Sequence, residues 1–151
     1  MKQKDGYILD VTYPIFFYKE MQALWLSNTI NFLGFKTPNI TKSFSYLELA
    51  CGTGINLIVC AINNPNGHFI GVDFNKEHID KAKNDANFIG LKNIEFIHSD
   101  FATFLEINHN KFDFIVNHGT FSWISPTNQK NILKIVSEFL NDLGILYLHY
   151  M

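Results

Sequence analysis

A glycine-rich turn and the acids around it are the residues of this sequence best suited to binding a ligand. The segment YLELACGTGIN, residues 46–56, reads as a buried strand, a tight turn and the start of a helix. Gly52 and Gly54 lack a Cβ atom, so the backbone there can approach a ligand closely. The helix that follows offers free N–H groups and the positive end of its dipole. Such a turn also occurs as a purely structural connection, so further signals are needed.

Three acids stand at the carboxyl ends of three successive predicted strands. Glu48 precedes Gly52 by four residues, and Asp73 follows the turn at the end of the second strand. A carboxylate at that second position can accept hydrogen bonds from the two hydroxyls of a ribose. Asp100, beside Phe101, could accept from an adenine amino group while the ring packs on the base. Helix capping is the structural alternative for Asp73 and Asp100, but it does not account for all three acids.

The elements that position these residues alternate along the chain. Short apolar runs predict strands at 45–50, 68–73, 94–100, 112–119 and 145–150, and helical spacing predicts helices at 52–64, 75–90 and 126–144. This order predicts an α/β fold, a doubly wound, Rossmann-like and mainly parallel sheet of about five strands. A further amphipathic helix is expected over 16–33, with an apolar face formed by Phe17, Met21, Leu24, Trp25, Thr29 and Phe32. We therefore divide the chain into an N-terminal arm and helix, residues 1–43, and a nucleotide-binding domain, residues 44–151.

Composition excludes several classes of protein. Of 151 residues, 47% are hydrophobic and 17% charged, which is incompatible with a disordered chain. The formal net charge is −2 and no arginine is present, so the basic face of a nucleic-acid binder is not expected. Polar residues interrupt the apolar stretch 15–35, and the N-terminus has no signal-peptide core, so we expect no membrane span and a cytoplasmic protein.

Cysteines and histidines give no indication of a metal centre. Cys51 and Cys60 are too few for a zinc site or a disulfide framework, and they are expected to be free thiols. The six histidines show no pair at ligand spacing. His118 differs from the others because it ends the fourth predicted strand and faces the expected crevice. Phe121 and Trp123 are expected in the core or in a pocket wall, with the core as the default.

The motif series ELACGTG, GVDFN, FIHSDF and FDFIVNHG, taken in this order, resembles that of class I S-adenosylmethionine (SAM)-dependent methyltransferases over residues 44–150. No single motif is specific, but the combination is. The family often has glycine where this chain has Ala50. The resemblance implies SAM as the cofactor and the following cofactor-binding residues: Glu48, Ala50, Cys51, Gly52, Gly54, Asp73, Phe74, Asp100, Phe101, Asn117 and His118.

The same resemblance implies a role for each part of this set. Glu48 would lie by the methionine end of SAM, Asp73 would bind the ribose, and Phe74 would lie against the adenine. Asp100 would contact the adenine amino group, while the backbone around Asn117 and His118 would line the methyl end. A catalytic base is not identified by the motifs. His118 and, from the N-terminal arm, Tyr13 are the two candidates.

A narrower resemblance concerns the acceptor. Tyr13-Pro14, NPNGHFIGVDFN and HGTFSWISP are similar to a bacterial subgroup that often carries an additional methyltransferase regulatory domain and includes protein-lysine methyltransferases. The expected acceptor is therefore a protein lysine or a small molecule. Class I folds normally have seven strands, so the chain is expected to be a fragment or a truncated homologue. Its fifth strand would form an exposed edge through which copies could associate.

Three other functions compete with methyl transfer to a protein or a small molecule. An NAD-type Rossmann domain needs a third glycine where this chain has Leu57. A nucleic-acid amino-methyltransferase would carry two prolines after the fourth strand, where the sequence is Asn117-His118-Gly119-Thr120. A module that binds SAM without turning it over, either a catalytically incomplete fragment or a regulatory domain, stays open as the main alternative.

Overall fold

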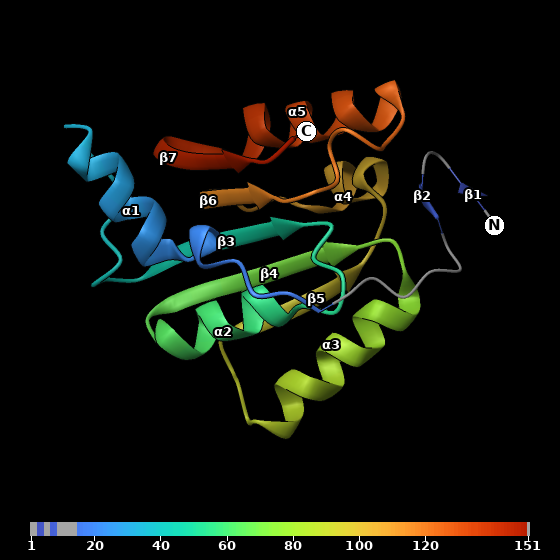
Figure 1. Ribbon diagram of the computed structural model, residues 1–151, viewed down its shortest axis with the longest axis horizontal. Helices are drawn as coiled ribbons and strands as arrows, with labels where there is room; N and C mark the ends of the chain where they lie inside the picture. The colour runs from blue at the N-terminus through green and yellow to red at the C-terminus, as the bar shows by residue number, and fades with distance from the viewer. Residues whose placement is uncertain (1–2, 5–6, 9–14, 151) are drawn as a thin grey trace.

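A five-stranded parallel sheet forms the centre of the computed structural model, which describes residues 3–4, 7–8 and 15–150 (Figure 1). Its spatial order is β5-β4-β3-β6-β7. The strands are β3 (Phe44–Leu49), β4 (Gly67–Asp73), β5 (Ile94–His98), β6 (Phe112–Asn117) and β7 (Leu140–Leu148). Every pair in the sheet is parallel, which confirms the predicted fold class. A separate antiparallel pair joins β1 (Gln3–Lys4) and β2 (Tyr7–Ile8).

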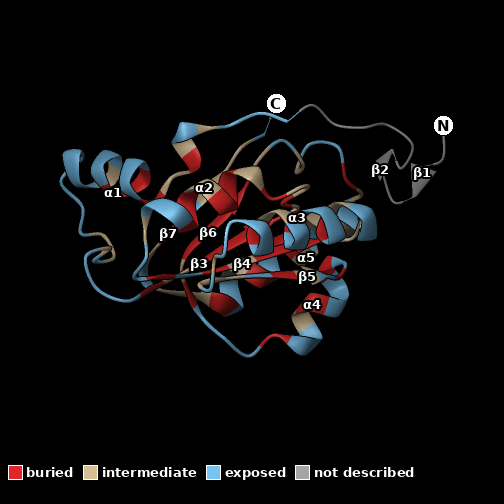
Figure 2. Ribbon diagram, turned by 90° about the horizontal axis from the view of Figure 1, so that it is seen from below, coloured by how far each residue is buried: buried red, intermediate tan, exposed pale blue. Residues whose placement is uncertain are grey.

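Helices cover both faces of the sheet. Their bounds are α1 (Ala23–Phe32), α2 (Ile55–Asn63), α3 (Lys76–Phe88), α4 (Phe101–Ile107) and α5 (Pro126–Phe139), with a 3-10 helix at Lys19–Met21. Buried side chains of α1, α2 and α3 pack on one face, and those of α4 and α5 pack on the other. The strands therefore lie buried between two helical layers (Figure 2). No helix in the described part of the chain is long and apolar enough to cross a membrane.

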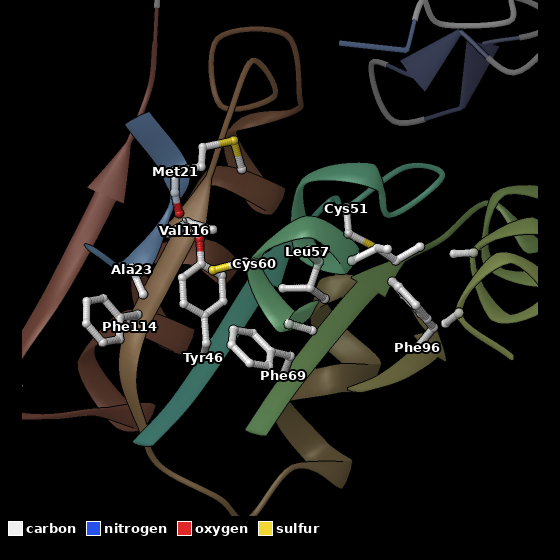
Figure 3. Close-up of a cluster of buried hydrophobic side chains, with 14 of the residues drawn as sticks. Met21, Ala23, Tyr46, Cys51, Leu57, Cys60, Phe69, Phe96, Phe114 and Val116 are labelled. Atoms are coloured by element: carbon white, nitrogen blue, oxygen red, sulfur yellow. Dashed lines mark hydrogen bonds between the residues drawn. The ribbon is translucent and has the colours of Figure 1, made fainter. Parts of the chain in front are cut away.

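Alternation along β3 shows how the sheet is built. Tyr46 belongs to the core cluster under α1 and α2, whereas Leu47 and Leu49 belong to the cluster under α4 and α5. A strand with both faces buried must be apolar on both, which is why the predicted strands appear as continuous apolar runs. The buried Tyr46 hydroxyl donates a hydrogen bond to the carbonyl of Met21 (Figure 3). That bond fastens the N-terminal segment to the central strand.

The N-terminal helix is shorter than the sequence predicts. It begins at Ala23 rather than near residue 16, because Gln22 is extended and the 3-10 helix precedes it. The predicted apolar face is also wrong, since Leu24, Trp25 and Phe32 are exposed. The residues of α1 that are buried are Ala23, Leu26 and Ser27. The spacing of apolar residues therefore predicted the wrong face of this helix to be buried.

The C-terminal part departs from expectation in two places. Helix α5 ends at Phe139 rather than at 144, and β7 begins at Leu140, which pairs with Phe112. Regular pairing resumes only at Ile145, so residues 141–144 bulge out of the ladder. Helix α4 was not predicted at all. Among the described residues β7 pairs only with β6, as expected for an edge strand, and self-association through it stays a prediction.

The bulge holds a residue in an unfavourable backbone conformation. Leu143 has φ +65° and is mostly exposed, so it carries left-handed strain without much compensating burial. We expect Leu143→Gly to raise the free energy of unfolding by up to about 1 kcal/mol, measured by urea denaturation. Leu133→Gly, at an exposed site inside α5, should lower it by a similar amount because glycine disfavours helix. Destabilisation by both changes would refute the assignment of strain to Leu143.

Candidate functional site

The candidate site lies where the strand order reverses. β3 lies between β4 and β6. The connection after β3 leads to β4 on one side, and the connection after β6 leads to β7 on the other side, so the two run in opposite directions across the sheet. Doubly wound sheets bind ligands in the crevice outside the carboxyl ends of the strands at such a point. The predicted turn occupies it. Ala50, Gly52 and Gly54 all have positive φ, and Gly54 is the N-cap residue of α2.

Ala50 is the position at which this sequence departs from the glycine often found in the resembling family. Ala50 has φ +57°, in the left-handed region that a side chain with Cβ adopts at a cost of about 1 kcal/mol or more. Glycine, the residue often found here in the resembling family, would adopt it without that cost. The turn thus keeps its shape in this chain in spite of the alanine.

Asp73 holds the turn in place. One of its carboxylate oxygens accepts from the backbone N–H of Gly52 at 2.9 Å, and the other accepts from that of Asn75 at 2.8 Å. Asn75, not Asp73, caps α3 by accepting from the N–H groups of Glu77 and His78. The capping alternative for Asp73 is therefore wrong. Its carboxylate fixes the distance between the turn after β3 and the end of β4.

Glu48 is the least compensated charge in the site. It is only 4% exposed, and its Oε2 atom has no hydrogen-bond partner among the described residues. Burial first, and the nearby Asp73 carboxylate second, raise the pKa of Glu48 from its ordinary value of 4.5 to about 8. A buried acid beside a second acid is well suited to receive a positively charged ligand.

The two glycines of the turn serve different purposes. A Cβ atom on Gly54 would lie 2.6 Å from the Phe96 ring and 3.0 Å from the Cβ of Ala82, so this position has no room for a side chain. A Cβ atom on Gly52 would meet nothing within 4 Å. Gly54 is thus required for packing α2 against β5 and α3. Gly52 borders open space on the side where a ligand would lie.

The end of the third predicted strand is arranged differently from expectation. Asp100 is exposed and caps α4, accepting from the N–H of Thr103 at 2.8 Å, as the capping alternative proposed. Phe101 is 4% exposed and belongs to the core under α4 and α5. Phe74 is partly exposed, and its carbonyl lies 2.9 Å from Nε2 of His98. Phe74 therefore offers an accessible surface that Phe101 lacks.

Asn117 links the ends of β6 and β3. It is fully buried, and its side-chain amide donates to the carbonyl of Leu49 at 2.9 Å. Its Oδ1 atom has no hydrogen-bond partner within the described part of the chain. Both strand ends that form the crevice are thus held together by one side chain.

His118 lies within a group of rings, which we call the ring cluster: Tyr18, His118, Tyr147 and His149. The Tyr18 and His149 rings have their centroids 3.9 and 4.3 Å from that of His118. The Tyr147 hydroxyl is 3.2 Å from Nδ1 of His118. Burial, and then the charge of His149, lower the pKa of His118. Of these rings the sequence indicated only His118, although the alternation in ILYLHY could have placed Tyr147 and His149 on one face.

Comparison with known proteins decides the family. The family model described as "Methyltransferase domain" matches residues 40–151. The chain belongs to this family. It is 37% identical over 150 residues to an uncharacterized protein of Synechocystis, of which it spans 30%, and 37% identical over 141 residues to one of Rickettsia prowazekii, of which it spans 25%.

A solved structure agrees with this assignment. PKMT2 from Rickettsia typhi, in complex with AdoHcy, has a TM-score of 0.83 and 30% identity to this chain, covering 89% of it. The chain spans 26% of that protein, so it corresponds to a part of longer relatives. The predicted fold, family and cofactor are thereby confirmed: this is a class I SAM-dependent methyltransferase domain.

The other residues singled out in the sequence are placed as follows. Tyr13 falls outside the described residues. Trp123 is 63% exposed, so the core position expected by default is wrong, and Phe121 is partly buried. Cys51 and Cys60 are free and buried, and burial raises the pKa of the Cys60 thiol to about 12. Within the described ranges, no three His, Cys, Asp or Glu residues could together hold a metal ion.

A hollow of the domain lies away from the strand ends, beside α1. It has a volume of about 820 Å³ and is lined by Leu24, Trp25 and Phe32 of α1 together with polar residues of the 3-10 helix and the end of α2. None of the acids described above borders it. The crevice, and not this hollow, combines the glycine turn with buried carboxylates, so the crevice is the candidate site.

The two turn glycines give a direct test of the site. Gly54→Ala should lower the free energy of unfolding by about 3 kcal/mol, since both left-handed strain and overlap with Phe96 oppose it. Gly52→Ala should lower it by about 1 kcal/mol, from strain alone. Urea denaturation of the two variants measures both values. Equal losses would contradict the view that Gly52 borders open space.

The buried carboxyl of Glu48 makes stability depend on pH. Because its pKa is raised to about 8, the folded chain binds this proton more tightly than the unfolded chain, and stability falls as pH rises from about 4.5 to 8. Glu48→Gln removes this loss. The free energy of unfolding of the variant, relative to that of the wild type, should therefore be higher at pH 9 than at pH 5, by at most about 5 kcal/mol. Denaturation at both pH values measures the effect. The exposed Glu106→Gln is the control, and identical pH dependence in wild type and Glu48→Gln would refute the assignment.

Proposed function

We propose that this domain binds SAM in the crevice at the carboxyl ends of β3, β4 and β6 and transfers its methyl group to the amine of a protein lysine. The observation that carries this proposal is the unpartnered Oε2 atom of Glu48, buried beside Asp73. With a pKa of about 8, Glu48 is protonated near pH 7 in the empty domain, and a cation bound beside it and Asp73 would favour its charged form. The methionine end of SAM carries a sulfonium and an ammonium group, so it has the charge that the site lacks.

The other residues of the crevice fit the rest of the cofactor. Each oxygen of Asp73 accepts one backbone N–H and keeps a lone pair that can accept from a ribose hydroxyl. The open side of Gly52 provides the space that a ligand over the turn requires. Phe74 and Asp100 would hold the adenine, with Phe101 supporting them from the core. Ala50, Cys51 and Gly54 shape the turn, and Asn117 and His118 would line the methyl end.

Binding of NAD is disfavoured by a packing contact. The third glycine of the dinucleotide fingerprint allows close packing of helix on strand. In this chain Leu57 is at that position, and it is fully buried. A Cβ atom on Gly71 of β4 would lie 2.9 Å from Leu57, so here the small residue that permits close packing is on the strand. The turn therefore lacks the third glycine of the dinucleotide fingerprint.

The lysine acceptor is supported by likeness to particular relatives. The motifs that resemble the subgroup containing protein-lysine methyltransferases agree with the similarity to PKMT2. Other relatives bear names with different chemistry, such as a carboxy-SAM synthase of Nautilia profundicola, which is 33% identical over 129 residues. Bound SAM supplies an electrophilic methyl group on a positively charged sulfur. The chain must supply orientation, exclusion of water and a group that removes the proton from a lysine amine, whose free pKa is about 10.4.

Calorimetric titration with SAM, AdoHcy and NAD tests the cofactor site. We expect SAM and AdoHcy to bind, Asp73→Ala to weaken SAM binding at least about 100-fold, and Gly52→Ala to weaken it at least about tenfold. Asp80→Ala is the matched control, because Asp80 is exposed and pairs with Lys76 on the surface of α3. Circular dichroism verifies that each variant is folded. Binding of NAD in place of SAM would refute the proposal.

Methyl transfer separates an enzyme from a module that only binds SAM. The assay uses SAM with a radiolabelled methyl group and poly-L-lysine as the amine acceptor. Label on the polymer supports the proposed function. Binding of SAM without transfer to poly-L-lysine, or to the lysines of proteins from a bacterial extract, would favour the alternative of a SAM-binding module.

A further inference from the structure

We propose that the ring cluster is the acceptor side of the active site, in which Nε2 of His118 takes the proton of the incoming lysine ammonium while Tyr147 and His149 act as positioning residues. This inference rests on the proposed function and adds to it the proton acceptor that the motifs did not identify. It starts from the place of the cluster in the fold. His118 directly follows Asn117, whose amide is bonded to the end of β3.

The N-terminal segment brings the cluster against the cofactor turn. The backbone N–H of Tyr18 donates to the side chain of Asn56 at 2.7 Å, and the amide of Asn56 donates back to the carbonyl of Phe16. Asn56 is in the first turn of α2, two residues after Gly54. Tyr18 is therefore fixed to the helix that starts at the glycine turn, and its ring covers His118. The cluster borders the crevice from β6, from β7 and from this segment.

The contact between His118 and Tyr147 bears on which nitrogen of His118 can take a proton, and the proposal requires the tautomer in which Nδ1–H donates to the Tyr147 oxygen. Nδ1 is 3.2 Å from the Tyr147 hydroxyl, and the rings of His118 and Tyr147 are nearly parallel, at 2°. When Nδ1–H donates to the Tyr147 oxygen, the lone pair of the neutral imidazole is on Nε2. His149 covers the ring at 4.3 Å and Tyr18 at 3.9 Å, so the edge carrying Nε2 is the part left to receive a substrate.

Burial, and then the charge of His149, keep His118 neutral near pH 7. The titratable groups that face it are Glu20 and Tyr18 of the N-terminal segment and Tyr147 and His149 of β7 and its end. Burial and His149 lower the pKa of His118, whereas Glu20 raises it. Burial also raises the pKa of Tyr147, so this hydroxyl stays protonated and uncharged. His118 is thus a neutral base near pH 7 and can accept a proton.

The proton and electron balance of the step is complete. The lysine ammonium gives one proton to Nε2 of His118, which becomes an imidazolium. The freed amine lone pair attacks the methyl carbon, the carbon–sulfur bond of SAM breaks, and its electrons return to sulfur as the neutral thioether AdoHcy. The product is a methylated ammonium, and the imidazolium later releases its proton to water. No further reactant is needed.

Histidine NMR tests the geometry without requiring turnover. In the full chain labelled with ¹⁵N, we expect His118 to titrate below its ordinary pKa of 6.5 and, when neutral, to carry its proton on Nδ1. Tyr147→Phe should shift the neutral ring toward a mixture of the two tautomers, and His149→Gln should raise the pKa of His118. The exposed His109→Gln is the control and should change neither. A neutral His118 protonated on Nε2 in the wild type would overturn the proposal.

The pH profile of methyl transfer tests the role. With poly-L-lysine as acceptor, His118→Gln should lower kcat about 100-fold or more and remove the rise of rate that follows the His118 titration. Tyr147→Phe should lower kcat while leaving KM for SAM unchanged. A purely structural ring cluster would reduce the rate by the same factor at every pH.

The two proposals fail in different ways. If SAM does not bind, the proposed function fails. If SAM binds and transfer occurs, but His118→Gln keeps both rate and pH profile, only the present inference fails. If poly-L-lysine is not methylated, the tautomer and the pKa of His118 measured by NMR still test the role proposed for the ring cluster.

Discussion

One carboxylate, that of Asp73, determines the shape of the crevice. It joins the turn after β3 to the end of β4 through two backbone N–H groups, and hydrogen bonds to a charged group each contribute about 1.5–3 kcal/mol. With the turn fixed, Glu48 is enclosed at the end of β3. The domain therefore keeps two acids close together in a buried place. Such a pair costs stability in the empty protein and favours a cationic ligand when one binds.

The sheet and the glycine turn could be predicted because their signals are local. A strand buried on both faces must be apolar throughout, so residues 45–50, 68–73 and 112–117 are distinct from the helices that separate them. The turn is equally visible, since positive φ at positions 52 and 54 favours glycine. The doubly wound parallel class followed from alternating strands and helices and from the rules of parallel crossovers, whereas the order β5-β4-β3-β6-β7 comes from the structure.

The parts that sequence analysis missed are set by contacts between distant residues. The predicted helix from residue 16 does not form there because the N–H of Tyr18 bonds to Asn56, 38 residues away, in place of a helical carbonyl. Helix α4 was missed because seven residues give little periodicity to detect. His118 was singled out by its place after β6, but its partners Tyr18 and His149 come from other parts of the chain. Helix capping accounts for the position of Asp100 but not for that of Asp73. The sequence alone does not distinguish these two acids, and the structure does.

The ring cluster also bears on the order in which the domain folds. Its rings come from the segment before α1, from the end of β6 and from the end of β7, the last strand of the chain. Loop closure over such separations is costly, so these rings can meet only after β6 and β7 have docked on the central strand. Interactions that form late on the folding pathway mainly slow unfolding. The cluster therefore joins the segment before α1 to the ends of β6 and β7, and its contacts are expected to slow unfolding more than they speed folding.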